Sequence, residues 1–431
     1  MIRSIGAKVL SILLFFTALP LWGETLTATI TAKKCDFVSR TFLQWIYRSH
    51  VQNLVEEELS DEQLLARIGT VMRNFDAPFL LSYLDQPLES FSWDLNAAKD
   101  ILNGLFTFTD PNCEALRSSE FESQAGKAGI AFEELLLKSL ALSMDPHSTY
   151  YTANQLELFS KKMGLSEVQS EDKIISRSWN FDGKSYAAIK LPLFYHGSGK
   201  DFSDILKQLK PEELSGLIVD VRDNIGGQTE ESIAILSHFL GARPLGMRYG
   251  FQLNRNLQAP EILVFRASRP SQVIYKGPLI VLINGGSGSA SEVFAAAIQD
   301  YQRGWVVGPN ATFGKGTLQE MLPVDAGAVK VTTSFLFRVT GQPLQQRGVI
   351  PDISIGYESE KKVIRERDLL YSLKAPEAID TRRKDKDLYS HVVSRGRLKE
   401  FTDAYKSEEG ADNAFELSRS LLVEMGDLTM D

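Results

Sequence analysis

The stretch that decides the fold is LIVLINGGSGSASEVFAAAIQDY, residues 279–301. It opens with five consecutive apolar residues, which is typical of a buried strand in a parallel sheet. A glycine-rich turn follows, and the remainder has the small and apolar residues of a packed helix. The stretch therefore predicts a strand at 279–283, a loop, and a helix from Ala290 to Tyr301.

The same order of strand, loop and helix occurs upstream. Leu217–Val221 is apolar except for one aspartate, and the loop Asp223–Gly227 follows it. The next helix is predicted at Thr229–Leu240, with Gly241 as its C-terminal stop. Further strands are predicted at 186–191, 305–307 and 329–337. This alternation predicts a layered α/β core, a sheet with flanking helices, whose reactive groups lie in loops at the carboxyl ends of parallel strands.

The segment before this core has a helical pattern. Residues 30–155 are predicted to form a helical N-terminal domain, in which Ser60 and Gln63 make a capping box. A strong helix is predicted at 130–142, and no polar residue in this part has a spacing that suggests chemistry. Residues 156–185 are polar and mixed in pattern, and we assign them to a connector.

The core is assigned to residues 186–358 and a charged helical C-terminal region to 359–431. Charges of alternating sign, including Arg365, Glu366 and Arg367, indicate a solvated helix face in this region.

The N-terminus is typical of a secretory signal peptide, residues 1–23. Arg3 and Lys8 provide a basic start, residues 9–19 form a mostly apolar run, and Pro20 ends it. Export to the periplasm or envelope is therefore expected. The cleavage site lacks the usual two small residues, so an uncleaved anchor stays an alternative.

Composition excludes several classes of protein. The hydrophobic share of 43% is that of a folded globular chain, and the net charge of −8 argues against a nucleic-acid binder. The five histidines are scattered, and Cys35 and Cys113 form no ligand cluster, so neither a metal nor another cofactor is expected. The two cysteines form a disulfide or remain packed thiols.

Ser289 lies where the glycine-rich loop meets the predicted helix, and three interpretations fit it. With Glu292 it forms a capping box, which alone accounts for a serine at this position. The loop is also suited to hold a phosphate, although the third glycine of the dinucleotide fingerprint is missing. A serine at a helix N-terminus also has free backbone N–H groups beside it, which stabilise an oxyanion during nucleophilic catalysis.

Lys315 lies in a second glycine-containing loop, Gly308–Thr317. The loop resembles a phosphate loop, but it has one residue too many, and Gly316 replaces the magnesium-binding hydroxyl residue, so no nucleotide is expected. We find no histidine in a loop beside Ser289, which leaves Lys315 as a candidate base if burial lowers its pKa towards roughly 7 to 8. Gln319 is placed to orient the amine. The alternative is a solvated loop lysine.

Four segments in register resemble the C-terminal processing, or tail-specific, serine peptidases. They are LIVDVRDNIGG (217–227), SGSASEVFAAAIQDY (287–301), TFGKGTLQ (312–319) and GVIPD (348–352). FDAPF (75–79) and DPHSTY (145–150) resemble the helical region of that family. The resemblance implies a crotonase- or ClpP-like α/β core and a peptidase that uses a Ser–Lys dyad.

Carried over by position, the resemblance implies that Ser289 is the nucleophile, Lys315 the base and Gln319 its orienting partner. Asp300 matches a family aspartate that we interpret as structural or accessory. The implied oxyanion donors are the N–H groups of Ala290 and of one glycine in the 226–227 pair, with Gly227 preferred to Gly226.

The usual PDZ domain of the family is expected to be absent, because the connector is too short to contain one. The resemblance implies polypeptide substrates, bound through extended strands or C-terminal segments, and a homo-oligomer is compatible with it. Two alternatives remain: a non-catalytic peptide-binding protein that keeps the peptidase scaffold, and a crotonase-like acyl-CoA enzyme, which the export signal disfavours.

Overall fold

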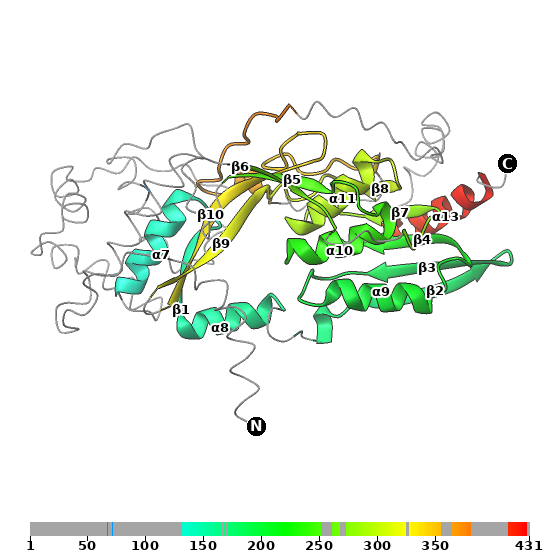
Figure 1. The fold of residues 1–431 in the computed structure, drawn as a ribbon, viewed down its shortest axis with the longest axis horizontal. Helices are drawn as coiled ribbons and strands as arrows, with labels where there is room; N and C mark the ends of the chain where they lie inside the picture. The colour runs from blue at the N-terminus through cyan, green and yellow to red at the C-terminus, as the bar shows by residue number, and fades with distance from the viewer. Residues whose placement is uncertain are drawn as a thin grey trace, which may run out of the picture.

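The computed structural model describes residues 67, 71, 132–164, 168, 170–250, 261–267, 273–324, 327–354, 364–380 and 413–428 (Figure 1). The signal peptide, the capping box at Ser60 and both cysteines lie outside the described residues. Among the described helices, none is long and apolar enough to cross a membrane.

A six-stranded sheet forms the centre of the molecule, in the order β11-β8-β7-β4-β3-β2. The strands from β11 to β3 are parallel, and β2 pairs antiparallel with β3 at the edge. Their bounds are β2 Ile175–Phe181, β3 Lys184–Lys190, β4 Leu214–Asp220, β7 Leu279–Leu282, β8 Trp305–Gly308 and β11 Ile353–Ser354. The predicted parallel centre is therefore confirmed.

Helices cover both faces of this sheet, as Figure 1 shows. Helices α9 (Ser198–Gln208), α10 (Thr229–Leu240) and α11 (Ala290–Asp300) lie on one face, and α13 (Asn413–Leu428) lies on the other. Successive strand residues point to opposite faces, so Leu217 and Val219 join the cluster with α10 and α11, whereas Ile218 packs against Leu422 of α13. Burial on both faces explains why the consecutive residues 217–219 of β4 are all apolar.

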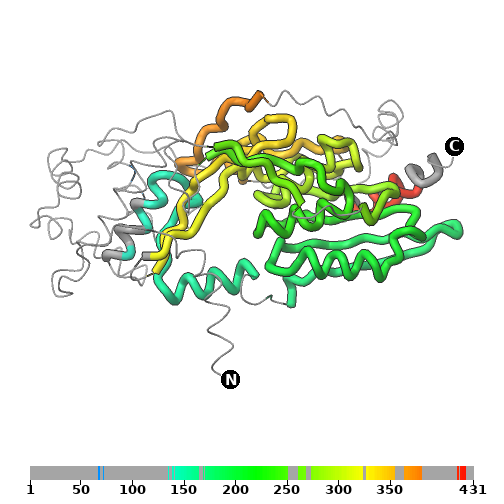
Figure 2. The backbone as a smooth tube through the Cα atoms, viewed as in Figure 1, coloured from blue at the N-terminus to red at the C-terminus, as the bar shows by residue number. Residues whose placement is uncertain are grey.

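A second sheet is antiparallel and carries β9, which follows the lysine loop. Its path is β1-β10-β5-β6, and β9 pairs with β10. The bounds are β1 Thr149–Thr152, β5 Gly246–Gly250, β6 Glu261–Phe265, β9 Thr317–Val324 and β10 Gly327–Phe337. Helices α7 (Phe132–Met144) and α8 (Ala153–Lys162) flank β1, and the long β9–β10 hairpin reaches towards them (Figure 2).

Three segments differ from the sequence-based expectation. The helical N-terminal region ends in a strand, β1, which pairs with β10. The connector 156–185 contains the edge strand β2, whose side chains are mostly exposed, and this exposure explains its polar sequence. Residues 364–380 contain a short 3-10 turn, η5 (Glu366–Asp368), and otherwise irregular backbone, instead of the expected helix. The domain boundaries themselves stay predictions.

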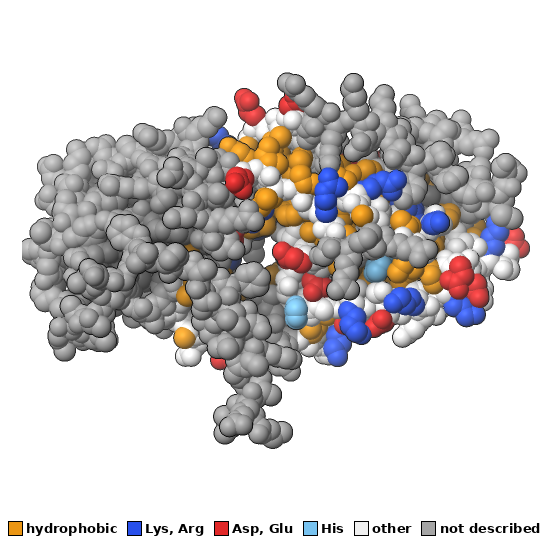
Figure 3. All heavy atoms as spheres, viewed as in Figure 1, with side chains coloured by type: hydrophobic (Ala, Val, Ile, Leu, Met, Phe, Trp, Pro, Cys, Tyr) orange, Lys and Arg blue, Asp and Glu red, His pale blue; other side chains and the backbone are white. Residues whose placement is uncertain are grey.

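Hydrophobic side chains are visible on one face of the molecule above the second sheet (Figure 3). On β6, Ile262 and Val264 are 47% and 38% exposed. Two large apolar side chains on an edge strand indicate a surface that is suited to contact with another peptide.

Candidate active site

Ser289 lies on a sharp turn between β7 and α11. Its backbone angles are φ 56 and ψ −114, a combination that residues other than glycine rarely adopt. Buried hydrogen bonds hold the turn: Ser287 Oγ donates to Val221 O at 2.7 Å, and Ser291 Oγ donates to Asn224 O at 2.8 Å. Such strain persists only where the surroundings impose it, and it concentrates at functional sites.

Glu292, in the first turn of α11, joins this turn to the lysine loop. One carboxylate oxygen accepts the N–H groups of Ser289 at 2.7 Å and Lys315 at 2.8 Å. The other oxygen accepts the Thr312 hydroxyl at 2.6 Å and the Gly314 N–H at 2.7 Å. Burial raises the pKa of Glu292 to about 7 despite these donors. A single buried carboxyl group therefore fixes Ser289 and Lys315 relative to each other.

The Lys315 side chain opens onto a cavity on one side and is packed by protein on the others. Its Nζ donates to Thr317 O at 2.7 Å and to Gln319 Oε1 at 2.7 Å. Burial lowers the pKa of Lys315 to about 8; the Lys330 ammonium also lowers it, whereas Glu366 raises it. At this value a sizeable fraction of the amine is neutral near pH 7 to 8, as a general base requires.

Gln319 is itself fixed by two hydroxyl groups. Its Nε2 donates to Thr317 Oγ1 at 2.9 Å and to Thr332 Oγ1 at 3.0 Å. These bonds leave the amide oxygen facing the lysine. The sequence-based pairing of Lys315 with Gln319 thus has a hydrogen bond in the structure.

A cavity of about 1170 Å³ brings Ser289, Lys315, Gln319 and Gly227 together. Its other walls include apolar residues of β6 and the end of α8. Within the described chain, Lys315 Nζ bonds to Thr317 and Gln319, and no hydrogen bond joins it to Ser289. Proton transfer between the two groups therefore requires a hydrogen bond that is not present in this arrangement of their side chains.

The loop Asp223–Gly227 presses against the start of α11. A Cβ placed on Gly226 would lie 2.7 Å from Ser289 Cβ and 2.8 Å from Gly288 O, so only glycine permits this approach. The Gly226 N–H donates to Asn224 Oδ1 at 2.9 Å. Among the hydrogen bonds of the described residues, neither the Gly227 N–H nor the Ala290 N–H has an acceptor. These two donors are available to a bound group.

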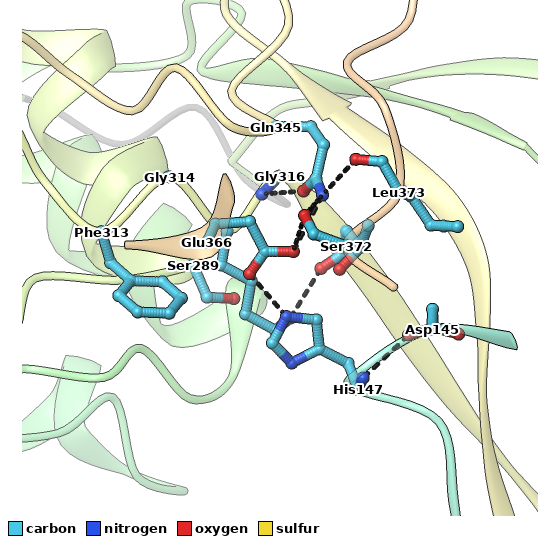
Figure 4. Close-up of polar contacts among 12 residues, drawn as sticks. Asp145, His147, Ser289, Phe313, Gly314, Gly316, Gln345, Glu366, Ser372 and Leu373 are labelled. Atoms are coloured by element: carbon cyan, nitrogen blue, oxygen red, sulfur yellow. Dashed lines mark hydrogen bonds and ion pairs between the residues drawn. The ribbon is translucent and has the colours of Figure 1, made fainter. Parts of the chain in front are cut away.

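His147 also lines this cavity, and the expectation that no histidine lies in a loop beside Ser289 is wrong. His147 Nε2 is 2.7 Å from Glu366 Oε2 (Figure 4). Burial and the Lys315 charge lower the pKa of His147, whereas Glu366 and Asp145 oppose this shift. Burial raises the pKa of Glu366, but contacts with His147, Gln345 and Lys315 outweigh it and the net pKa is lowered.

The prediction that Glu366 lies on a solvated helix face is also wrong, because its side chain is fully buried. Glu366 N–H donates to Phe313 O at 3.0 Å, and Gln345 Nε2 donates to Glu366 Oε1 at 2.8 Å. One acidic residue in this run of alternating charges, Glu366, faces the protein interior. The DPHSTY segment was the available signal for His147, but 219 positions separate this histidine from Glu366.

Asp300 does not line the cavity that contains Ser289. It lies at the end of α11, about three turns from Ser289, and accepts Arg338 Nη2 at 2.5 Å and Nε at 3.1 Å. Burial raises the pKa of Asp300, although Arg338 opposes the shift. These contacts tie α11 to the end of β10.

A strained serine at a strand-to-helix turn, beside a buried lysine and two free backbone N–H groups, is the arrangement of hydrolases that use an activated serine. Residues 185–355 match the family model Peptidase family S41. The matched segment contains Ser289, Lys315 and Gln319, so this part of the chain is similar to peptidase family S41, in agreement with its resemblance to the tail-specific peptidases.

Curated relatives carry the corresponding names. The chain is 36% identical over 199 residues to a tail-specific protease of Haemophilus influenzae, covering 44% of this chain and 27% of that protein. It is 33% identical over 153 residues to a carboxy-terminal-processing protease of Bartonella bacilliformis, covering 35% and 33%. The match thus spans about a quarter to a third of the relatives' length. A solved structure, photosystem II D1 C-terminal processing protease, aligns with TM-score 0.37 and 24% identity over 43% of this chain and 49% of that one.

Proposed function

We propose that this protein is a serine endopeptidase that cleaves exported or envelope polypeptides through an acyl-enzyme, with Ser289 as nucleophile and Lys315 as general base. One observation carries the proposal. Ser289 on its strained turn and Lys315 with its lowered pKa open into one cavity, and both are bonded to the Glu292 carboxyl group.

The residues present account for each step. Neutral Lys315 turns towards Ser289 and accepts its hydroxyl proton as the oxygen attacks a peptide carbonyl. The Gly227 and Ala290 N–H groups stabilise the oxyanion, and Gly226 is not the second donor because its N–H already binds Asn224. Protonated Lys315 then donates to the leaving amine. Water releases the acyl group by the same route in reverse.

His147 provides a second candidate for the base, and a specific contact favours testing it. Its imidazole has a lowered pKa, is oriented by Glu366 and lines the same cavity as Ser289. Lys315 is preferred as the base because its backbone N–H and that of Ser289 donate to the same Glu292 oxygen. His147 lies on a different segment and has no such shared contact with Ser289 among the hydrogen bonds of the described residues. We assign His147 and Glu366 to holding the lysine loop.

The test compares variants of the full chain on casein and on a fluorophosphonate probe that labels activated serines. Ser289→Ala should abolish both signals, and Lys315→Arg should lower digestion by about 10²–10⁴-fold because guanidinium stays protonated. Ser170→Ala, on an exposed 3-10 turn, is the matched serine control and should be fully active. Digestion at the wild-type rate by Ser289→Ala would refute the nucleophile.

The assignment of the base is checked in the same series. His147→Gln should keep measurable digestion with an unchanged alkaline pH dependence. If instead Lys315→Met stays active while His147→Gln is inert, the base is His147. A wild-type protein that neither digests casein nor reacts with the probe would support a non-catalytic peptide-binding protein on the same scaffold.

Export and the absence of a PDZ domain also stay proposals. Fractionation of cells that produce the full chain should recover it outside the cytoplasm, in the periplasm or envelope. Recovery of the whole pool in the cytoplasm would contradict the signal-peptide interpretation of residues 1–23.

A further inference from the structure

Lys330 is an ammonium group in the cavity wall that forms no ion pair with the described residues, although the buried Asp145 carboxyl group acts on it from a longer range and opposes the lowering of its pKa. The other cavity-lining groups that are not fully exposed have partners: His147 binds Glu366, Arg248 Nη1 lies 3.2 Å from Glu320, and Lys315 donates to Gln319. Within the described part of the chain, Lys330 Nζ makes neither a hydrogen bond nor an ion pair. It is half-buried, so water solvates it incompletely.

Lys330 lies next to the proposed base. On β10 it is two residues before Thr332, so the two side chains share a face, and Thr332 Oγ1 accepts Gln319 Nε2. The position is close enough that the Lys330 charge lowers the pKa of Lys315. A group bound to Lys330 would therefore lie beside the Ser289–Lys315 pair.

Two aromatic rings hold the ammonium in place. Its Nζ is 5.7 Å from the centre of the Tyr151 ring on β1 and 5.3 Å from that of Phe159 on α8. Rings at this range attract a cation but replace only part of the hydration that it loses. Consistently, burial lowers the pKa of Lys330. An anion that entered the cavity would offset this cost.

We propose that Lys330 binds a carboxylate of the polypeptide substrate and makes the site prefer peptides that carry one near the cleaved bond. The inference rests on the proposed function for the nature of its ligand. A single ammonium beside apolar rings suits a peptide carboxylate better than a phosphate, which favours arginine forks or several backbone N–H groups. The carboxylate comes either from the C-terminus or from an Asp or Glu side chain.

Binding is measured in the Ser289→Ala background, so that no turnover is needed. Three fluorescein-labelled peptides share one short apolar sequence: the first has a free C-terminus, the second an amidated C-terminus, and the third an amidated C-terminus with one internal Glu. Anisotropy titrations give their affinities for Ser289→Ala alone and combined with Lys330→Met or Lys330→Arg. Lys200→Met, an exposed lysine on α9, is the matched control.

We expect at least one carboxylate peptide to bind about ten- to a hundredfold tighter than the neutral peptide, as for a charged hydrogen bond. Lys330→Met should remove the preference, and Lys330→Arg and Lys200→Met should keep it. Which peptide shows the effect identifies the source of the carboxylate. Equal binding of all three, or a preference that survives Lys330→Met, overturns the inference. Lys330→Arg retains the charge and should keep the preference. If Lys330→Met loses the preference but has the circular dichroism spectrum of the parent protein, the loss is a loss of binding and not of folding.

Since binding is measured without catalysis, failure of this inference and failure of the proposed function give different results. A wild-type protein that digests casein but shows no carboxylate preference retains its function and loses this subsite. A protein that binds carboxylate peptides through Lys330 but does not digest casein keeps the subsite and loses the peptidase mechanism.

Discussion

Gly226→Ala tests whether the contact between the loop Asp223–Gly227 and Ser289 is required for catalysis. The added Cβ would lie 2.7 Å from Ser289 Cβ, whereas carbon atoms in contact are normally about 3.5–4.0 Å apart. The loop or the helix start must therefore move by about 1 Å. A displacement of about 1 Å costs roughly 10²-fold in rate, and loss of an oxyanion donor costs about 10²–10³-fold. We therefore expect kcat/KM of Gly226→Ala to fall by about 10²–10³-fold.

The same change should also lower stability. Gly226 has φ 108, which is unfavourable for alanine by about 1–3 kcal/mol, and overpacking adds about 1–3 kcal/mol. Gly197→Ala is the matched control, since Gly197 has φ 94 but no atom within 4 Å of an added Cβ. The control should lose stability alone. Urea denaturation and peptide hydrolysis measure the two effects, and wild-type kcat/KM in Gly226→Ala would refute the argument.

Three further predictions follow from the pKa shifts and the buried ion pair. Because Lys315 must be neutral and its pKa is about 8, log kcat/KM should rise with pH and level off above about 8; a plateau that extends to pH 6 would count against a lysine base. Burial raises the pKa of Glu292 from 4.5 to about 7, so its protonation contributes about 3 kcal/mol to the free energy of unfolding. This contribution is full below pH 4.5 and is lost as the pH rises through 7. Glu292→Gln should therefore flatten that part of the stability–pH curve in denaturation experiments. Arg338→Met should lower the free energy of unfolding by about 3–5 kcal/mol because Asp300 stays buried without its partner, whereas an unchanged urea midpoint would show that the pair is not important for stability.

The parallel core could be predicted because its elements are local and strongly apolar. The helix Thr229–Leu240 was predicted with the bounds that the structure has, and Gly241 ends it with φ 66. Buried strands such as β7 are continuous apolar runs that no amphipathic helix would show. By contrast, β2, β5 and β6 have mixed or exposed faces, and the N-cap residue of α9 is Gly197, which has no side chain to form a cap, so none of these elements was predicted.

The site was only partly predictable. Ser289, Lys315 and Gln319 could be selected because glycine-flanked loops mark them and four segments resemble one family. The role of Glu292 as acceptor for both loops depends on packing between segments 23 positions apart. His147 and Glu366 are brought together by the pairing of β1 with β10 and by the segment after residue 364, and neither leaves a periodic pattern.

The contacts of residues 365 and 366 with the lysine loop have a consequence for the newly made chain. Arg365 donates to the Thr312 carbonyl and Glu366 to that of Phe313, so the outer side of the lysine loop is held by residues about 50 positions downstream. During synthesis or translocation, a chain whose residues 365 and 366 have not yet emerged lacks these hydrogen bonds. We therefore expect a nascent chain to lack peptidase activity until these residues have been made. A chain that ends at residue 354 should show no proteolysis.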